Sequence, residues 1–225
     1  MVIAPTVFLW LYSGLCANSA ATRAILITID DLRADHLGCY GYSSARTRHI
    51  DQIAKEGAII KIQGNDLKRF ASLTNDQWDH LTHLLARESI ETARFSAARS
   101  SDEAAVISTV AWIEKYKASR FACWIRFSAS APYNPPIAFR QHVPRGANSE
   151  YDAQLAYIDY QIGRIRDALA RNNLLSSSLI VLTTTRMKDW HYSERSFPLV
   201  VSKSQMSAHS LVDLLSNSLL NHHER

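Results

Sequence analysis

The sequence contains few cysteines, and their number excludes a disulfide framework. Only three occur in 225 residues, at Cys16, Cys39 and Cys123, whereas a stapled fold uses several pairs. Their spacing relative to histidine is not typical of a zinc site either. Cys123 lies inside an apolar run at residues 121–127, so we expect it to be a small buried side chain.

The sequence also lacks a cluster of charge of one sign. Its 25 basic and 21 acidic residues give a net charge of +4, and the basic residues are scattered along the chain. A nucleic-acid-binding surface needs lysine and arginine gathered on one face. We therefore expect no nucleic-acid partner.

No hydrophobic run is long enough to predict a stable membrane span. The apolar, uncharged stretch at residues 2–16 is shorter than the roughly 20 residues that cross a bilayer. Small residues follow it, which is typical of a signal peptide with cleavage after Ser19 or Ala21. We expect residues 1–21 to be this signal, residues 22–225 to form one domain, and the protein to be secreted, periplasmic or otherwise exported. The alternative is a buried N-terminal strand or helix.

Apolar segments of two periodicities alternate along the rest of the chain, and 47% hydrophobic residues are enough to build a core. Strands are predicted at residues 24–29, 121–127, 179–183 and 197–201, with a further apolar run at 58–62. Helices are predicted at residues 49–56, 77–87, 100–117, 150–171 and 207–220. This alternation predicts an α/β fold, a three-layer α/β/α sandwich with a mostly parallel sheet.

Two of the predicted helices carry further signals. Ser100 and Glu103 have the spacing of a capping box, which places the start of one helix at Ser100. The helix at 150–171 has one apolar stripe, made of Tyr151, Leu155, Ile158, Ile162, Ile165 and Leu169. Asp159 and Asp167 are expected on the opposite, solvated face. There they would pair with the arginines of the same helix, Arg164, Arg166 and Arg171.

The strand at 24–29 ends in two adjacent acids, Asp30 and Asp31. Open α/β sheets bind their ligands at the carboxyl ends of their strands. Two adjacent carboxylates repel each other unless a cation or a shared proton relieves them. The pair therefore indicates half of a metal site, although an aspartate after a strand is also a common helix cap.

The segments IDDLRADHLGCYGY and HIDQIAKEGA closely resemble the opening of the sulfatase family, in the alkaline phosphatase superfamily. The resemblance continues through later segments, at residues 69–74, 80–95, 111–136, 151–169 and 178–185. It implies sulfuric ester hydrolysis of a sulfate ester substrate. It also implies a divalent metal, calcium or magnesium, held by Asp30 and Asp31, and an Arg69 that steadies nucleophile and metal.

The sequence departs from the family at the positions that carry catalysis and metal binding. Asn65 stands where the family has the cysteine or serine that becomes formylglycine, and an amide is not an activated nucleophile. Thr185 and Arg186 replace ligands of the second metal motif, and Ser130 replaces a sulfate-contacting histidine. The resemblance also implies a chain truncated in its interior and lacking the family's C-terminal subdomain.

These departures favour a catalytically silent sulfatase-like protein in which Arg69 is vestigial. No cofactor is expected, unless calcium or magnesium binds a site completed by other groups. Without a metal, Asp30 and Asp31 need another positive partner. Arg186 follows the neighbouring strand, so we predict a charge cluster of these three side chains.

Two alternatives remain open. One is an active hydrolase with a displaced site, whose nucleophile would be a serine and whose acid or base would be a histidine. The candidates are Ser43, Ser44, Ser72, Ser128, His36, His49 and His191. The other alternative is a non-catalytic binding module that uses tryptophans. Trp112 and Trp124 are expected in the core, whereas Trp190 is the better candidate for an exposed aromatic. The oligomeric state is not indicated.

Overall fold

The computed structural model describes residues 21–60, 74–97, 101–184, 198–202 and 211–220. The described strands form one six-stranded sheet in the order β2-β6-β5-β1-β4-β3. Their bounds are β1 Arg23–Asp30, β2 Ala58–Ile59, β3 Glu91–Ser96, β4 Phe121–Ser128, β5 Ser178–Thr183 and β6 Leu199–Val201. The four strands β3, β4, β1 and β5 run parallel, whereas β6 is antiparallel to β5 and β2 is antiparallel to β6. The predicted mostly parallel sheet is confirmed.

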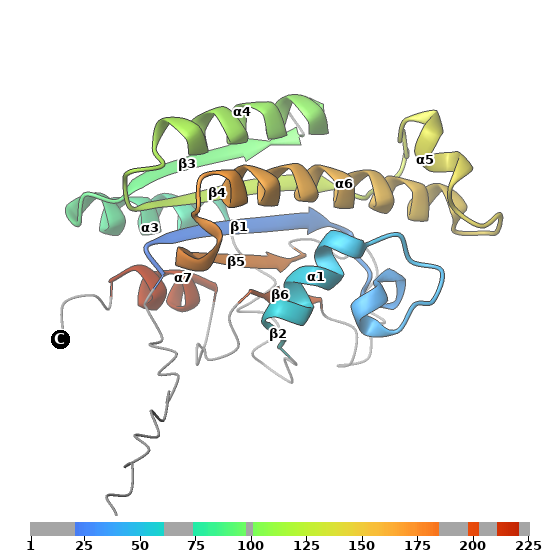
Figure 1. Ribbon diagram of the computed structural model, residues 1–225, viewed down its shortest axis with the longest axis horizontal. Helices are drawn as coiled ribbons and strands as arrows, with labels where there is room; N and C mark the ends of the chain where they lie inside the picture. Colours follow the sequence, from blue (N-terminus) through green and yellow to red (C-terminus); the bar gives the residue numbers. More distant parts are fainter. Residues whose placement is uncertain (1–20, 61–73, 98–100, 185–197, 203–210, 221–225) are drawn as a thin grey trace, which may run out of the picture.

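Helices cover both faces of this sheet (Figure 1). Their bounds are α1 Arg48–Glu56, α3 Asn75–Arg87, α4 Asp102–Lys115, α5 Ile137–Gln141, α6 Ser149–Arg171 and α7 Leu211–Leu220. Three short 3-10 turns complete the described elements: η1 Ala34–His36, η2 Gly38–Tyr40 and η4 Leu175–Ser177. On one face, α6 packs against α4, α1 and α5, and on the other α3 packs against α7. The α/β/α sandwich is therefore confirmed.

Alternate residues of each central strand feed two separate hydrophobic clusters. In β1, Ile25, Ile27 and Ile29 belong to the cluster that includes α1, α4 and α6. Leu26 points the other way and packs with residues of α3 and α7. Because a parallel strand covered on both faces buries both sets of side chains, it is apolar almost throughout. This is why β1, β4 and β5 were recognisable as strands from the sequence.

The cysteine and tryptophan predictions can be compared with these clusters. Cys123 is buried, and burial raises the pKa of its thiol. Trp124 is buried beside Trp78, with ring centroids 5.6 Å apart, and Trp112 packs half-buried against the other cluster. The predicted core positions of Cys123, Trp112 and Trp124 are therefore confirmed, and Trp190 lies outside the described residues.

The start of α4 differs from the prediction by one residue. Its N-cap is Ser101, whose side chain accepts a hydrogen bond from the backbone N–H of Ala104 at 3.1 Å. The capping box predicted at Ser100 and Glu103 is therefore wrong. Only Ser100 has a glutamate three residues on, whereas the N-cap Ser101 is followed there by Ala104, so the spacing pointed to the wrong serine. A capping box does occur at the start of α3, between Thr74 and Gln77.

The apolar stripe of α6 is confirmed, since all six of its residues are buried. The solvated position predicted for Asp159 is wrong. Asp159 is 2% exposed, and its carboxylate accepts the backbone N–H groups of His49, at 3.0 Å, and Ile50, at 2.9 Å. Thr47, the N-cap residue of α1, makes no side-chain cap bond. The side chain of Asp159 on α6 therefore caps the neighbouring helix α1. Of the two acids predicted on the solvated face, Asp167 is the one that is exposed.

The arginines of α6 also have other partners than predicted. Arg166 pairs with Glu56 at the end of α1, with Nη2 2.9 Å from Oε1. Arg164 contacts Glu103 of α4 at 3.6 Å and donates to Gln161 at 3.0 Å. The ion pairs predicted within α6 are replaced by these contacts, because α1 and α4 place Glu56 and Glu103 next to Arg166 and Arg164.

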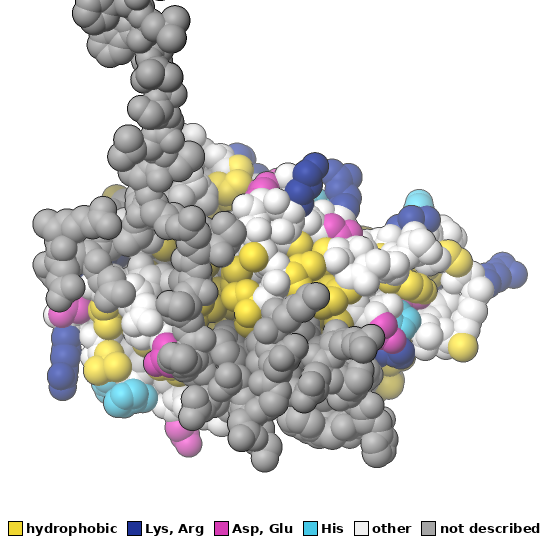
Figure 2. Space-filling model, turned by 90° about the horizontal axis from the view of Figure 1, so that it is seen from below, with side chains coloured by type: hydrophobic (Ala, Val, Ile, Leu, Met, Phe, Trp, Pro, Cys, Tyr) yellow, Lys and Arg dark blue, Asp and Glu magenta, His cyan; other side chains and the backbone are white. Residues whose placement is uncertain are grey.

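Figure 2 shows the molecule from the edge of the sheet at which β2 lies, and hydrophobic side chains gather in the middle of this view. Ala58 and Ile59 of β2 are half-buried. No helix within the described ranges is long and apolar enough to cross a membrane. The predicted signal peptide, apart from Ala21, lies outside the described residues and stays a prediction.

Candidate functional site at the carboxyl edge of the sheet

The strand order places β1 between β4 and β5, so the carboxyl ends of three parallel strands meet at one edge. In the β1–β4 register, Asp30 lies opposite Ser128. The pairing continues past the strand ends, because the N–H of Ala129 donates to the carbonyl of Asp30 at 3.0 Å. The acid pair therefore faces the loop at residues 129–136, where ligands of open α/β sheets bind.

Asp30 is paired with an arginine of the neighbouring strand. Arg126 of β4 lies opposite Thr28 of β1. Because side chains two residues apart on a strand point to the same face, Arg126 lies on the same face of the sheet as Asp30. Its Nη2 donates to Oδ2 of Asp30 at 2.7 Å, and its Nε donates to Oδ1 at 3.1 Å. The Asp30 side chain is 11% exposed and that of Arg126 is 30% exposed. Both carboxylate oxygens are therefore engaged by one guanidinium group.

Asp31 occupies a left-handed turn immediately after the strand, with φ of 57°. The hydroxyl of Ser130 donates to its Oδ2. The backbone of the turn is held by Tyr151 of α6, whose hydroxyl donates to the carbonyl of Asp31 at 3.2 Å and accepts from the N–H of Arg33 at 2.9 Å. The position at which the family resemblance implies a histidine is thus occupied by a serine bonded to the second acid.

A third acid, Asp102, lies at the start of α4 and was not singled out from the sequence. Gln154 of α6 donates to its Oδ2 at 3.3 Å and to the carbonyl of Ser128 at 3.5 Å. Burial raises the pKa of Asp102 to about 6, and the bond from Gln154 partly offsets this. No local pattern could have identified Asp102, because its environment is created by α6.

His36 lies close behind the acid turn, in η1. It is 4% exposed, and its Nδ1 lies 2.5 Å from Oδ1 of Asp152. Tyr42 donates to the other oxygen of Asp152 at 2.9 Å, and its ring packs on that of His36. His36 is therefore a buried histidine that ties η1 to α6, rather than an accessible acid or base.

The other candidates for a displaced catalytic site do not form a nucleophile–base pair within the described residues. His49 lies half-buried against Gly163 of α6, and burial lowers its pKa. Ser128 accepts a hydrogen bond from the N–H of Ser130 at 3.3 Å. Ser43 is exposed and Ser44 is half-buried. None of the three described serines is hydrogen-bonded to a histidine.

Several predicted positions lie outside the described residues: Asn65, Arg69, Ser72, Thr185, Arg186 and His191. The predicted cluster of Arg186 with the two acids therefore stays a prediction. Over the ranges that are described, no three or more side chains of His, Cys, Asp and Glu lie close enough together to hold a metal ion.

Known proteins resemble this chain in two ways. Human arylsulfatase D is 46% identical over 44 residues, which are 20% of this chain and 7% of that protein. The crystal structure of a phosphonate monoester hydrolase from Agrobacterium radiobacter aligns with a TM-score of 0.64 at 14% identity, covering 88% of this chain and 73% of that one. The fold is a sulfatase-like fold.

A second solved structure agrees with this. The PsFucS1 sulfatase from a Pseudoalteromonas species aligns with a TM-score of 0.66 at 14% identity, covering 88% of this chain and 67% of that one. No family model matches the sequence. The family resemblance seen in the sequence is therefore confirmed at the level of fold. Because hydrolases of different esters share the sulfatase-like fold, the fold by itself does not assign an activity.

Proposed function

We propose that this chain is a sulfatase-like protein without sulfuric ester hydrolase activity. The observation that carries the proposal is the Arg126–Asp30 pair. The family resemblance makes Asp30 a metal ligand, yet both of its oxygens already accept hydrogen bonds from a guanidinium group.

The edge residues do not fit a divalent cation. Calcium and magnesium need several oxygen ligands, and among the described residues no three or more side chains of His, Cys, Asp and Glu gather here around Asp30 and Asp31. A guanidinium within hydrogen-bond reach of one ligand also repels the ion. At 4 Å and an effective dielectric constant of about 20, two unit charges interact by about 4 kcal/mol, so a divalent ion would be disfavoured by roughly twice that. Arg126 offsets the charge of Asp30 in place of a metal.

The sequence supports the same proposal at the nucleophile. Asn65 holds the position that must carry the reacting oxygen, and its amide cannot supply one. Thr185 and Arg186 stand in place of the acid and the histidine or asparagine of the second metal motif, and neither supplies a carboxylate, so Arg69 would remain as a vestige of the family's apparatus. The segment shared with arylsulfatase D spans only 7% of that protein, so this match does not extend to the whole of an active sulfatase.

A hydrolase with a displaced site is the less favoured function. Such a site needs a nucleophile within hydrogen-bond reach of its base. His36, the more buried of the two candidate histidines that the structure describes, is bonded to Asp152 instead. Binding of a ligand without turnover is compatible with the proposal.

The purified full chain tests the proposal directly. We expect no hydrolysis of 4-nitrophenyl sulfate above the protein-free rate, and no saturable heat of binding with calcium or magnesium in titration calorimetry. Turnover that disappears in Asp30→Ala, but persists in Asp213→Ala on α7, would show that the acid pair is catalytic and would overturn the proposal.

A further inference from the structure

A cavity of about 600 Å³ lies between the segment entering α1, the short helix α5 and the middle of α6. None of the residues at the carboxyl edge of the sheet, Asp30, Asp31, Arg126 and Ser130, lines it. It is therefore separate from the site discussed above. Its volume is within the usual range for small-molecule pockets, roughly 300–1,000 Å³.

One wall of the cavity is apolar and aromatic. Phe139 of α5 packs on Tyr160 of α6 with ring centroids 5.7 Å apart, and on Tyr157 with centroids 5.2 Å apart. Ala138 and Ala156 widen the space beside these rings. Tyr160 is 50% exposed, one of the few large hydrophobic side chains in the described residues to be so open. This wall suits the flat apolar body of a ligand.

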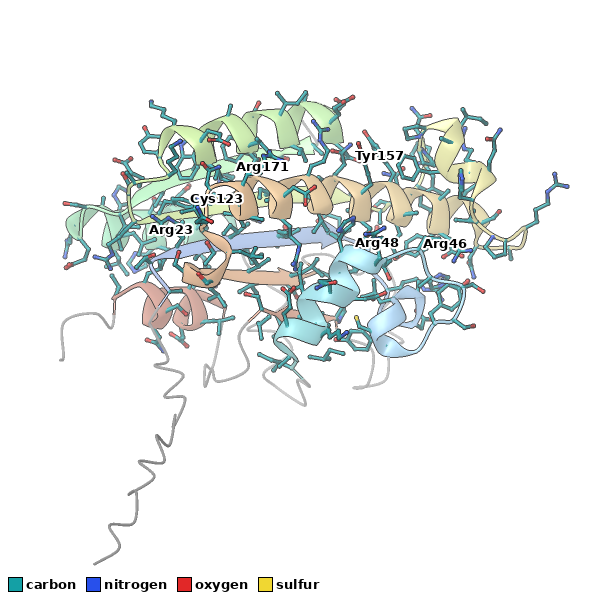
Figure 3. All side chains as sticks on the ribbon, viewed as in Figure 1. Arg23, Arg46, Arg48, Cys123, Tyr157 and Arg171 are labelled. Carbon is teal, nitrogen blue, oxygen red and sulfur yellow. The ribbon has the colours of Figure 1, made fainter. Side chains whose placement is uncertain are left out.

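Two arginines also line the cavity, Arg46 just before α1 and Arg48 as its first residue. Figure 3 labels Arg46 and Arg48 beside the half of α6 that lies next to α5. Both residues line the cavity, and both are exposed. Arg46 donates through Nε to the carbonyl of His142 at 3.2 Å, and both residues belong to the cavity lining. Arg48 makes no hydrogen bond or ion pair within the described part of the chain. Its charge is therefore available to a ligand.

The acids that line the cavity offset these arginines only in part. Asp159 is occupied by the N–H groups of His49 and Ile50, and burial raises its pKa to about 7. Asp51 accepts from the N–H of Cys39 at 2.8 Å. These carboxylates are thus engaged by hydrogen-bond donors of the protein, while Arg46 and Arg48 are both exposed.

We infer that this cavity binds a small aromatic anion, whose ring packs on Phe139 and Tyr160 and whose oxyanion lies between Arg46 and Arg48. Charge complementarity favours an anion, the aromatic wall favours a ring, and the volume favours a small molecule over a folded partner. A guanidinium group recognises a carboxylate, sulfate or sulfonate through the same charge-assisted hydrogen bonds. The inference does not depend on the proposed loss of hydrolase activity, since it uses neither the acid pair nor a metal.

The test uses the full chain and two probes of nearly equal shape, naphthalene-2-sulfonate and neutral naphthalene-2-sulfonamide. In titration calorimetry we expect the sulfonate to bind at one site, roughly tenfold tighter than the sulfonamide, since a charge-assisted contact contributes about one decade in Kd. Arg48→Gln and Arg46→Gln should each weaken sulfonate binding several-fold. Ala138→Trp, which fills the cavity from an exposed position, should abolish it.

The matched control is Arg145→Gln, which removes the same charge from an exposed arginine after α5 that does not line the cavity. Its sulfonate affinity should equal that of the wild type, and the melting temperatures of all variants show that they fold. Equal binding of both probes, no binding of either, equal weakening by Arg145→Gln, or binding that survives Ala138→Trp would each overturn the inference. Self-association lost in Arg48→Gln would assign the cavity to a second copy of the chain instead.

Discussion

Arg126 and Asp30 join neighbouring parallel strands through a guanidinium that donates to both carboxylate oxygens, at 2.7 and 3.1 Å. The pair lies at the edge of the sheet where the sequence predicts a metal. It is partly buried, so the charge of Asp30 is offset inside the protein rather than by water.

This pair is expected to stabilise the fold measurably. Arg126→Gln takes away the guanidinium group that engages both oxygens of the nearly buried Asp30 carboxylate. Because Arg126 is partly exposed, we expect a loss of about 2 kcal/mol, between the values for surface and fully buried pairs. A double-mutant cycle with Asp30→Asn in urea unfolding measures the coupling.

The comparison for that cycle is the exposed pair Arg140–Glu150, with Nε 3.0 Å from Oε2. Its coupling should stay below about 1 kcal/mol. If the two cycles gave the same coupling energy, the pair at the sheet edge would be an ordinary surface contact.

Asp159 should make the protein less stable as the pH rises toward 8. Its pKa is raised by burial to about 7 in the folded chain, whereas an unfolded aspartate has a pKa of about 4. The folded state therefore holds this proton more tightly than the unfolded state does. The resulting stabilisation of the fold is complete below pH about 4 and is lost as the pH rises through about 7. We expect wild type to lose roughly 1–3 kcal/mol more than Asp159→Asn between pH 5 and 8.

The asparagine keeps an oxygen for the N–H groups of α1, so the variant tests the charge rather than the cap. Asp102, whose pKa is raised to about 6, also lowers stability as the pH rises. It does so equally in wild type and in Asp159→Asn, so its effect cancels when the two pH profiles are subtracted. Asp167→Asn, at an exposed position of the same helix, should leave the pH profile of wild type unchanged. A profile of Asp159→Asn parallel to that of wild type would contradict the prediction.

Gly163 should be required only because His49 packs on it. A methyl group at Gly163 would lie 2.6 Å from Nε2 of His49, so Gly163→Ala must displace the ring and should destabilise the wild type by about 1 kcal/mol. In a His49→Ala background, the same change removes a glycine from a helix interior and should stabilise by roughly 0.5–1 kcal/mol. Thermal unfolding of the four proteins checks this reversal, and the same sign in both backgrounds would refute it.

The cap of α4 provides a local prediction. Ser101→Ala removes the acceptor of the Ala104 N–H and should cost about 1 kcal/mol in denaturant unfolding. Ser100→Ala is the matched change one residue earlier and should have little effect. Equal losses in both variants would mean that the cap is shared between the two serines.

Much of the fold could be predicted because its signals are local. β1, β4 and β5 are uninterrupted apolar runs, and α6 has an apolar stripe at helical spacing, so each element is specified by its own residues. The acid pair was likewise found from a strand followed by two carboxylates. Arg126 was missed, although a charged residue inside the run FACWIRFS was a visible signal, because its partner depends on the β1–β4 register.

The order of residues along the chain is enough to specify the strands β1, β4, β5 and β6, the main helices, the mostly parallel sandwich and the position of Asp30 and Asp31 at a strand end, whereas β3 was not predicted. Periodicity and apolar content suffice for these features, since burial acts on each segment in the same way. Three relationships depend on the folded arrangement: Arg126 pairs with Asp30, Asp159 caps α1, and Arg46 and Arg48 line a cavity with aromatic residues. Each of these relationships joins residues about 90 or more positions apart in the chain, and charges and hydrogen bonds act over a few ångströms. Their partners are therefore set by packing rather than by spacing in the sequence.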